Sequence, residues 1–247
     1  MTSTAHAAIK TADVEYTSTD GALMQGYVVY DDAKKSPRPG IIIVHDWMGL
    51  GQYDKNKAEQ LAKEGYVAFA ADIYGKGIRP ANADEAGKLA TKYKNDRTLL
   101  RAHIRAAYDK LESMPQVNPA KMLVMGYCFG GTTALELARS GAPLVGTASF
   151  HGGLSTPTPQ DAKNIKGKVL VMHGADDPHV PPAEVAAFKK EMADANIDMT
   201  FIAYPGAVHA FTNPDAGSDP SKGMAYNADA DKKSWAEFEK FLKQVFK

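Results

Sequence analysis

The sequence lacks the features that mark secreted and membrane-spanning proteins. It has one cysteine in 247 residues, which excludes an internal disulfide framework and fits a reducing compartment. No apolar run approaches the roughly 18 residues that a membrane span needs. Residues 1–10 lack the basic and apolar regions of a signal peptide. We therefore expect a cytoplasmic protein that does not act at a membrane.

An excess of charge of either sign is also missing. Lys+Arg and Asp+Glu both number 29, and no basic block or stripe interrupts the chain. A nucleic acid is therefore not expected as a partner. The histidines and the cysteine form no paired or clustered ligand motif, so we expect no metal ion and no other cofactor. The expected partner is a small molecule, and the chain is expected to act as a monomer or a homodimer.

Short apolar runs alternate with helix-forming segments along most of the chain. Residues 1–12 are predicted as a flexible arm, and residues 14–19 and 23–30 as a hairpin turning at Asp20-Gly21. Further strands are predicted at 40–44, 66–71, 121–125, 143–150, 168–173 and 199–204, and helices at 54–64, 82–114 with a break near 94–95, 131–139, 182–194 and 229–246.

This alternation predicts the α/β class: a doubly wound, mostly parallel sheet with an N-terminal antiparallel hairpin and helices on both faces. No linker is long enough to divide the chain, so we expect one domain over residues 13–247. The segment 151–167 is too short to build a large lid. We therefore expect an open site.

The stretch from Gly126 to Gly131 reads Gly-Tyr-Cys-Phe-Gly-Gly and joins a predicted strand to a predicted helix. A strand, a sharp turn and a helix form the context of a nucleophile elbow, with Cys128 at the position of the nucleophile. A helix N-terminus favours the thiolate form of such a side chain. The alternative interpretation is a buried structural cysteine in a glycine-rich turn.

Ligands of a doubly wound sheet lie beyond the carboxyl ends of its strands. Three residues that follow successive strands supply a nucleophile, an acid and a base: Cys128, Asp177 and His209. Asp176 is the competing carboxylate, but Asp177 precedes a proline that fixes the following turn. This order of nucleophile, acid and histidine is the order found on α/β-hydrolase sheets.

The other histidines have structural interpretations. We expect His6, His103 and His179 at the surface, and His45, His151 and His173 as hydrogen-bonding residues at the floor of the site. An oxyanion hole requires two backbone N–H groups. The topology assigns these to Phe129 and to Trp47 or a neighbour.

Together, the Gly-Tyr-Cys-Phe-Gly-Gly stretch, His-Asp-Trp-Met-Gly at 45–49, Gly-Ala-Asp-Asp-Pro-His-Val-Pro at 174–181 and the His209 loop resemble the dienelactone hydrolase family. The resemblance covers roughly residues 13–246. It implies an α/β-hydrolase fold, a Cys128–His209–Asp177 triad and an acid that contacts the resting nucleophile. That acid corresponds to Asp46, where the family often has Glu.

Two further positions depart from the members that cleave dienelactones. Lys76 and Asn213 stand where those members carry arginines that hold the substrate carboxylate. The substrate therefore need not be a dienelactone, and an aryl ester or another lactone is an equally good candidate. We assign substrate binding to Lys76, Asn213, Tyr127 and Phe211. The chain also resembles a metal-free phosphotriesterase of this family.

These observations predict a cysteine-dependent hydrolase of small activated esters or lactones that works through a covalent intermediate on Cys128. Metal-independent hydrolysis of aryl phosphotriesters is expected at the same site. Two alternatives stay open: a thiol amidase or peptidase that uses the same triad, and a redox-sensing thiol protein without turnover.

Overall fold

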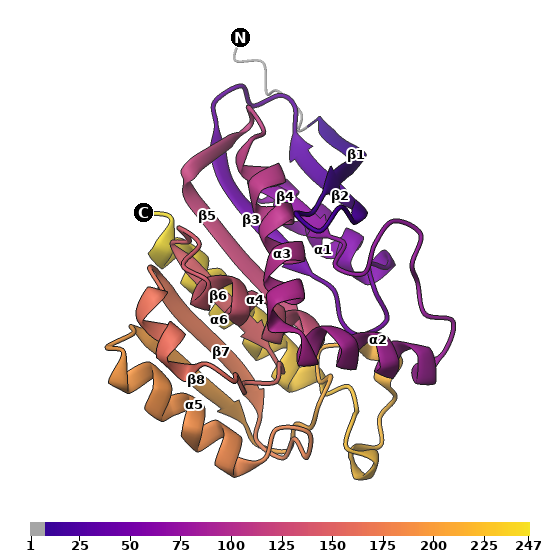
Figure 1. The fold of residues 1–247 in the computed structure, drawn as a ribbon, viewed down its shortest axis with the longest axis vertical. Helices are drawn as coiled ribbons and strands as arrows, with labels where there is room; N and C mark the ends of the chain where they lie inside the picture. The colour runs from indigo at the N-terminus through magenta and orange to yellow at the C-terminus, as the bar shows by residue number, and fades with distance from the viewer. Residues whose placement is uncertain (1–7) are drawn as a thin grey trace. The chain divides into compact units, whose positions relative to one another are not determined.

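A computed structural model describes residues 8–247, in which strands and helices alternate after an opening hairpin (Figure 1). The Cα positions group into two compact units, the first ending at Leu123 and the second formed by Val124–Lys247. The expectation of one domain over residues 13–247 stays a prediction.

The first unit is a mixed sheet covered by helices. Its strands follow the order β1-β2-β4-β3-β5, in which β1 pairs with β2 and β2 with β4 in antiparallel fashion, and β3 pairs with β4 in parallel. Helix α1 packs on β2 and β4, and α3 packs on β3. The elements are β1 (Ile9–Thr17), β2 (Leu23–Asp31), β3 (Arg38–Val44), α1 (Gln52–Lys63), β4 (Val67–Ala71), α2 (Ala83–Asn95), α3 (Arg97–Glu112) and the start of β5 (Val117–Tyr127).

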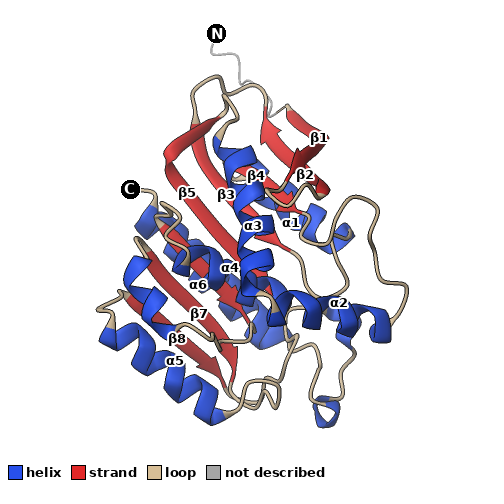
Figure 2. Cartoon of the chain, in the orientation of Figure 1, coloured by secondary structure: helices blue, strands red, loops and turns tan. Residues whose placement is uncertain are grey.

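The second unit continues β5 and adds three parallel strands in the order β5-β6-β7-β8. Figure 2 shows its helices (blue) and strands (red) alternating along the chain. The elements are α4 (Phe129–Arg139), β6 (Gly146–Phe150), η1 (Pro159–Asn164), β7 (Lys168–Gly174), α5 (Pro182–Asp194), β8 (Met199–Tyr204), η2 (Pro214–Ala216), η3 (Pro220–Lys222) and α6 (Ala228–Val245).

Neighbouring residues of β6 show that helices cover both faces of the sheet in the second unit. Phe150 packs edge-on against Phe238 of α6. Ser149 points the other way, because side chains alternate along a strand. Its Oγ lies 2.5 Å from the place that a Cβ on Gly131 of α4 would occupy. The predicted mostly parallel sheet, N-terminal hairpin and two-sided helical cover are confirmed.

A buried ion cluster fixes the helix that follows the elbow. Arg139 at the end of α4 is fully buried and donates to Glu191 Oε1 at 2.7 Å, Glu191 Oε2 at 2.8 Å and Glu136 Oε1 at 3.0 Å. It also donates to the carbonyl of Leu154 at 3.0 Å. These bonds join α4 to α5. Removing one partner of such a cluster leaves a buried charge uncompensated, which typically costs about 3–5 kcal/mol.

The N-terminal arm was predicted too long. Residues 9–12 belong to β1, where Ile9 pairs with Asp31 and Ala12 with Val28, because β2 is long enough to pair with them. Residues 1–7 of the predicted arm, which include His6, lie outside the described residues. The segment 151–167 holds only η1, which packs against α4 and α5.

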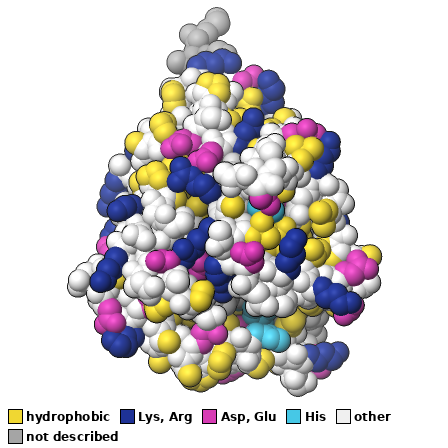
Figure 3. Space-filling view, in the orientation of Figure 1, with side chains coloured by type: hydrophobic (Ala, Val, Ile, Leu, Met, Phe, Trp, Pro, Cys, Tyr) yellow, Lys and Arg dark blue, Asp and Glu magenta, His cyan; other side chains and the backbone are white. Residues whose placement is uncertain are grey.

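The face drawn in Figure 3 carries Lys and Arg side chains interspersed with Asp and Glu, without a patch of one sign. No helix among residues 8–247 has the length and apolar character needed to cross a membrane.

Candidate active site

Cys128 lies at the sharp turn between β5 and α4. Its backbone has φ +52° and ψ −115°, a region that side-chain-bearing residues rarely adopt. Neighbouring glycines make the turn sterically feasible, since a Cβ on Gly126 would lie 2.1 Å from the carbonyl oxygen of Gly130. The predicted strand, sharp turn and helix are therefore present. The thiol stands at the N-terminus of α4, where backbone N–H groups lack acceptors within the helix.

His209 contacts both Cys128 and Asp177. Its Nε2 lies 2.9 Å from Cys128 Sγ, and its Nδ1 lies 2.8 Å from Asp177 Oδ2. The backbone N–H of His179 donates to the other carboxylate oxygen of Asp177 at 2.8 Å, which orients this side chain. Asp176 is exposed, and its side chain accepts from the backbone N–H of Gly206 instead. Of the two candidate acids, Asp177 is therefore the one that meets the histidine.

The histidine of this trio is buried, although it lies in a loop, with only 7% of its surface exposed. Burial alone lowers the pKa of His209, but the Cys128 charge and the Asp177 hydrogen bond outweigh burial and raise it from 6.5 to about 10. Burial raises the pKa of Asp177, yet the hydrogen bond and charge of His209 leave it below its usual range. The electrostatics therefore favour the protonated form of His209.

A second histidine, His151, lies next to His209. Its Nδ1 is 3.2 Å from the backbone N of Cys128, and its Nε2 is 2.8 Å from Thr212 Oγ1. Its ring packs edge-on against His209 and Phe211, at centroid distances of 5.3 and 5.0 Å. Burial, and then the charge of His209, hold the pKa of His151 well below its usual range. The sequence predicted His151 as a hydrogen-bonding residue, but it did not predict the contact with Thr212.

Of the other histidines, one has the exposure that was predicted from the sequence and another does not. His179 is exposed as predicted and packs edge-on against the ring of His209. His103 was expected at the surface but is buried, because its ring nitrogens bond the Ile73 carbonyl and Asp20 Oδ2 within the first unit. His173 packs against Phe201, and its Nδ1 has no hydrogen-bond partner among the described residues.

The loop after β3 belongs to the first unit and has its own hydrogen bonds. His45 Nδ1 lies 2.6 Å from the carbonyl oxygen of Asp46, and Tyr74 donates from its hydroxyl to the carbonyl of Trp47 at 3.0 Å. Asp46 Oδ1 accepts from the backbone N–H of Met48 at 2.8 Å. The roles expected for Asp46 as a contact of the nucleophile and for Trp47 as an oxyanion donor stay predictions.

The residues assigned to substrate binding have structural contacts of their own. Lys76 forms an ion pair with Glu15, and Asn213 Oδ1 caps η2 by accepting from a backbone N–H at 2.9 Å. Tyr127 is 3% exposed and packs on Phe150, while Phe211 is fully buried. Their contact with substrate stays a prediction, as does the backbone N–H of Phe129, the first residue of α4, as an oxyanion donor.

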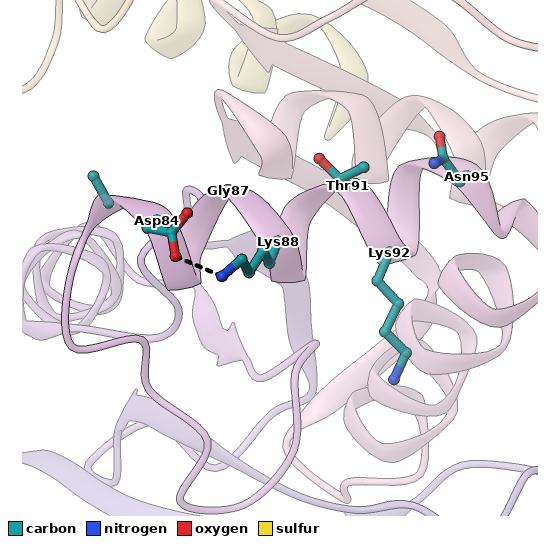
Figure 4. Close-up of a pocket in the computed structure, with 7 residues that line it drawn as sticks. Asp84, Gly87, Lys88, Thr91, Lys92 and Asn95 are labelled. Atoms are coloured by element: carbon teal, nitrogen blue, oxygen red, sulfur yellow. Dashed lines mark hydrogen bonds and ion pairs between the residues drawn. The ribbon is translucent and has the colours of Figure 1, made fainter.

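Within the first unit, an open hollow runs along one face of α2 (Figure 4). Gly87, Thr91 and Asn95 recur every four residues along it, and the Asp84–Lys88 ion pair is drawn there as a dashed line. None of the predicted catalytic residues lines this hollow. Residues 8–247 contain no group of three or more His, Cys, Asp or Glu side chains placed to hold a metal ion.

Comparison with known proteins defines the class. A solved dienelactone hydrolase-like promiscuous phosphotriesterase from metagenomic libraries is 36% identical, with a TM-score of 0.91 over 98% of this chain and 100% of that one. The chain therefore has the α/β-hydrolase fold.

The profile of the dienelactone hydrolase family matches residues 24–246, and the chain belongs to this family. Protein usf of Aquifex pyrophilus is 33% identical, over 78% of this chain and 84% of its own length. A protein of Saccharolobus solfataricus, provisionally named carboxymethylenebutenolidase, is 26% identical over 94% of this chain and 98% of its own. The chain is thus a hydrolase that acts on ester bonds.

The electrostatics of His209 give a first prediction. Its pKa in the folded state, about 10, lies above its ordinary value of 6.5. The bound proton therefore stabilises the fold fully below about pH 6.5, and this contribution is lost as the pH rises towards 10. Cys128→Ser removes the charge that raises the pKa most, so the His209 pKa should fall in this variant.

An NMR titration of the imidazole resonances in both proteins measures this shift. His45 of the first unit, whose burial lowers its pKa to about 4, serves as the internal reference and should titrate alike in both. An equal His209 pKa in the two proteins would contradict the electrostatic coupling of His209 to Cys128.

Proposed function

We propose that the chain hydrolyses small activated esters and lactones through a covalent intermediate on Cys128. The observation that carries this proposal is His209, whose two ring nitrogens meet Cys128 Sγ at 2.9 Å and Asp177 Oδ2 at 2.8 Å. A nucleophile, a base and a carboxylate that orients the base are the parts that acyl transfer requires.

In the first step the thiolate of Cys128 attacks the carbonyl carbon and forms a C–S bond. The charge that develops on the carbonyl oxygen is stabilised by backbone N–H groups at the N-terminus of α4, including that of Phe129. The C–O bond to the leaving group then breaks, and the protonated His209 gives its proton to the departing oxygen. The product of this step is a thioester on Cys128.

In the second step His209, now neutral, takes a proton from water as the water oxygen attacks the thioester. The C–S bond breaks, the acid product leaves, and the thiolate–imidazolium pair forms again. Asp177 stays ionised throughout and holds Nδ1–H, which keeps Nε2 directed at the reacting atoms. The low pKa of Asp177 supports this role.

The leaving group distinguishes esters from amides as substrates of this triad. An amide leaves only when its nitrogen is protonated, so an amidase needs a strong general acid at the moment of bond cleavage. The Cys128 charge, which raises the pKa of His209 most, disappears when the C–S bond forms, so His209 becomes a stronger acid at that point. An aryl ester or lactone has a leaving oxygen that needs far less assistance. The thiol amidase therefore remains the second candidate.

Aryl phosphotriesters fit the same chemistry. Attack by the thiolate forms a P–S bond, and the negative charge develops on the phosphoryl oxygen. The P–O bond to the aryl group then breaks, and the protonated His209 gives its proton to the departing oxygen, so that a phenol leaves. Water, deprotonated by His209, then attacks phosphorus, the P–S bond breaks, and a phosphodiester leaves with the thiolate restored. The relative described as a promiscuous phosphotriesterase supports this extension. The proposed route uses only the side chains of the triad.

The adjacent carboxylates provide a matched test of the orienting role. Asp177→Asn should lower kcat for an aryl ester by about 10²–10⁴-fold, because it disturbs the tautomer and orientation of the base. Asp176→Asn changes an exposed residue that binds Gly206 and should leave kcat within about threefold of the wild type. Steady-state kinetics of both variants show which aspartate orients His209. A greater loss in Asp176→Asn would mean that the wrong acid was assigned.

A chromogenic aryl phosphotriester tests the second substrate class. The wild type should turn over repeatedly, because the thiolate leaves readily from phosphorus in the second step. Chelators should not change its rate, because the proposed route uses the residues of the triad. In Cys128→Ser the phosphoserine ester should resist that step, so the variant should release at most one equivalent of product. The time course of product release measures both. A wild type that stops after one equivalent would leave an ester hydrolase that such compounds merely inhibit.

A further inference from the structure

The side chain of His151 has both ring nitrogens engaged, and each bond leads to a different part of the site. Nδ1 faces the backbone N–H of Cys128 at 3.2 Å, and this N–H also donates to the carbonyl of Phe150 at 3.0 Å. Nε2 faces Thr212 Oγ1 at 2.8 Å. His151 therefore bonds the nucleophile turn on one side and the loop that carries His209 on the other.

These partners define the tautomer of His151. A backbone N–H can only donate, so Nδ1 must carry a lone pair and the ring proton must reside on Nε2. Nε2–H then donates to the hydroxyl oxygen of Thr212. A doubly protonated ring would place one N–H against the N–H of Cys128. The geometry therefore requires a neutral His151.

The backbone supports this arrangement. His151 has φ +41°, and Ala210, between His209 and Thr212, has φ +58°. Both residues carry side chains in the left-handed region, a strained conformation that persists only where surrounding contacts hold it. The His151 ring is 2% exposed and packs against Phe211, so it cannot turn away from these partners.

We propose that His151 is a positioning residue that locks the Cys128 turn to the His209 loop through Thr212. This inference rests on the proposed function, because it assigns His151 to the same reaction. Cys128 N–H and Thr212 Oγ1 are held by one rigid ring, so the separation of Sγ and Nε2 is fixed by the bonds of His151. Loss of the Thr212 bond should loosen the loop and lengthen that separation.

The titratable groups around His151 agree with a fixed neutral ring. The ring of His209 packs edge-on against it, and the charge of His173, on β7, also acts on it. Both disfavour a second proton on His151. His151 therefore serves as an uncharged acceptor and donor, while the adjacent His209 carries the proton that the reaction moves.

Substitution at Thr212 tests the proposal without touching the triad. Thr212→Val keeps the volume but removes the hydroxyl, whereas Thr212→Ser keeps the hydroxyl. We expect the valine variant to lose about 10- to 100-fold in kcat for an aryl ester with little change in KM, as misplacement of a reacting group does. The serine variant should recover kcat to within about threefold. Thr158→Val removes a hydroxyl bond to Asp161 at the start of η1 and is the matched control.

The rate of Cys128 alkylation by iodoacetamide is a second readout, because it needs no substrate. It should fall in Thr212→Val and return in Thr212→Ser. If the wild type hydrolyses no ester, the proposed function fails, and the alkylation rates still test His151. Wild-type rates in Thr212→Val, or equal losses in the valine and serine variants, would overturn the proposal. Heteronuclear NMR of the wild-type imidazoles adds a check that needs no variant: a proton on Nδ1 of His151 would also overturn it.

Discussion

The hydrogen bond between His209 and Cys128 joins residues that are 81 positions apart in the chain, and the proposed reaction depends on it. The bond forms at a sharp turn, where Cys128 adopts φ +52° at the N-terminus of α4. That conformation in turn requires glycine at 126, since a side chain there would collide with the Gly130 carbonyl. Buried bonds from Arg139 to Glu136, Glu191 and the Leu154 carbonyl hold the far end of α4.

The pKa values of the two histidines in the site depend on the same contact. His209 lies between Cys128 and Asp177, whose charge and hydrogen bond raise its pKa against the effect of burial. The ring of His151 packs against that of His209, and burial and the charge of His209 lower the pKa of His151. The pKa values of two neighbouring histidines are thus shifted in opposite directions. One is suited to moving a proton, and the other to holding a fixed network of hydrogen bonds.

Much of this arrangement could be predicted from sequence because it depends on local signals. The run Gly126-Tyr127-Cys128 between an apolar strand and a helix predicts the turn, and the proline after Asp177 identifies the acid that meets His209. The alternation of strands and helices predicts the sheet. The break near 94–95 is confirmed at Asp96, which caps α3 by accepting from a backbone N–H.

Other features depend on contacts between distant residues, and no local pattern reveals them. The local sequence does not indicate that His103 is buried, because its partner Asp20 is 83 residues away. The contact of His151 with Thr212 spans 61 residues, and the ion pair of Arg139 with Glu191 spans 52. The pairing of Ile9 with Asp31 was missed because residues 9–12 alternate too weakly between apolar and polar to stand out as a strand.

The most direct test of the central claim is to locate the acyl group during turnover. The wild type is mixed with a chromogenic aryl ester, quenched in acid before the steady state, digested and examined by mass spectrometry, with Cys128→Ala treated in parallel. A covalent intermediate on the single cysteine predicts an acyl group on the peptide that contains Cys128, and no hydrolysis by the alanine variant. An acyl group on another residue, or hydrolysis by Cys128→Ala at the wild-type rate, would contradict the account.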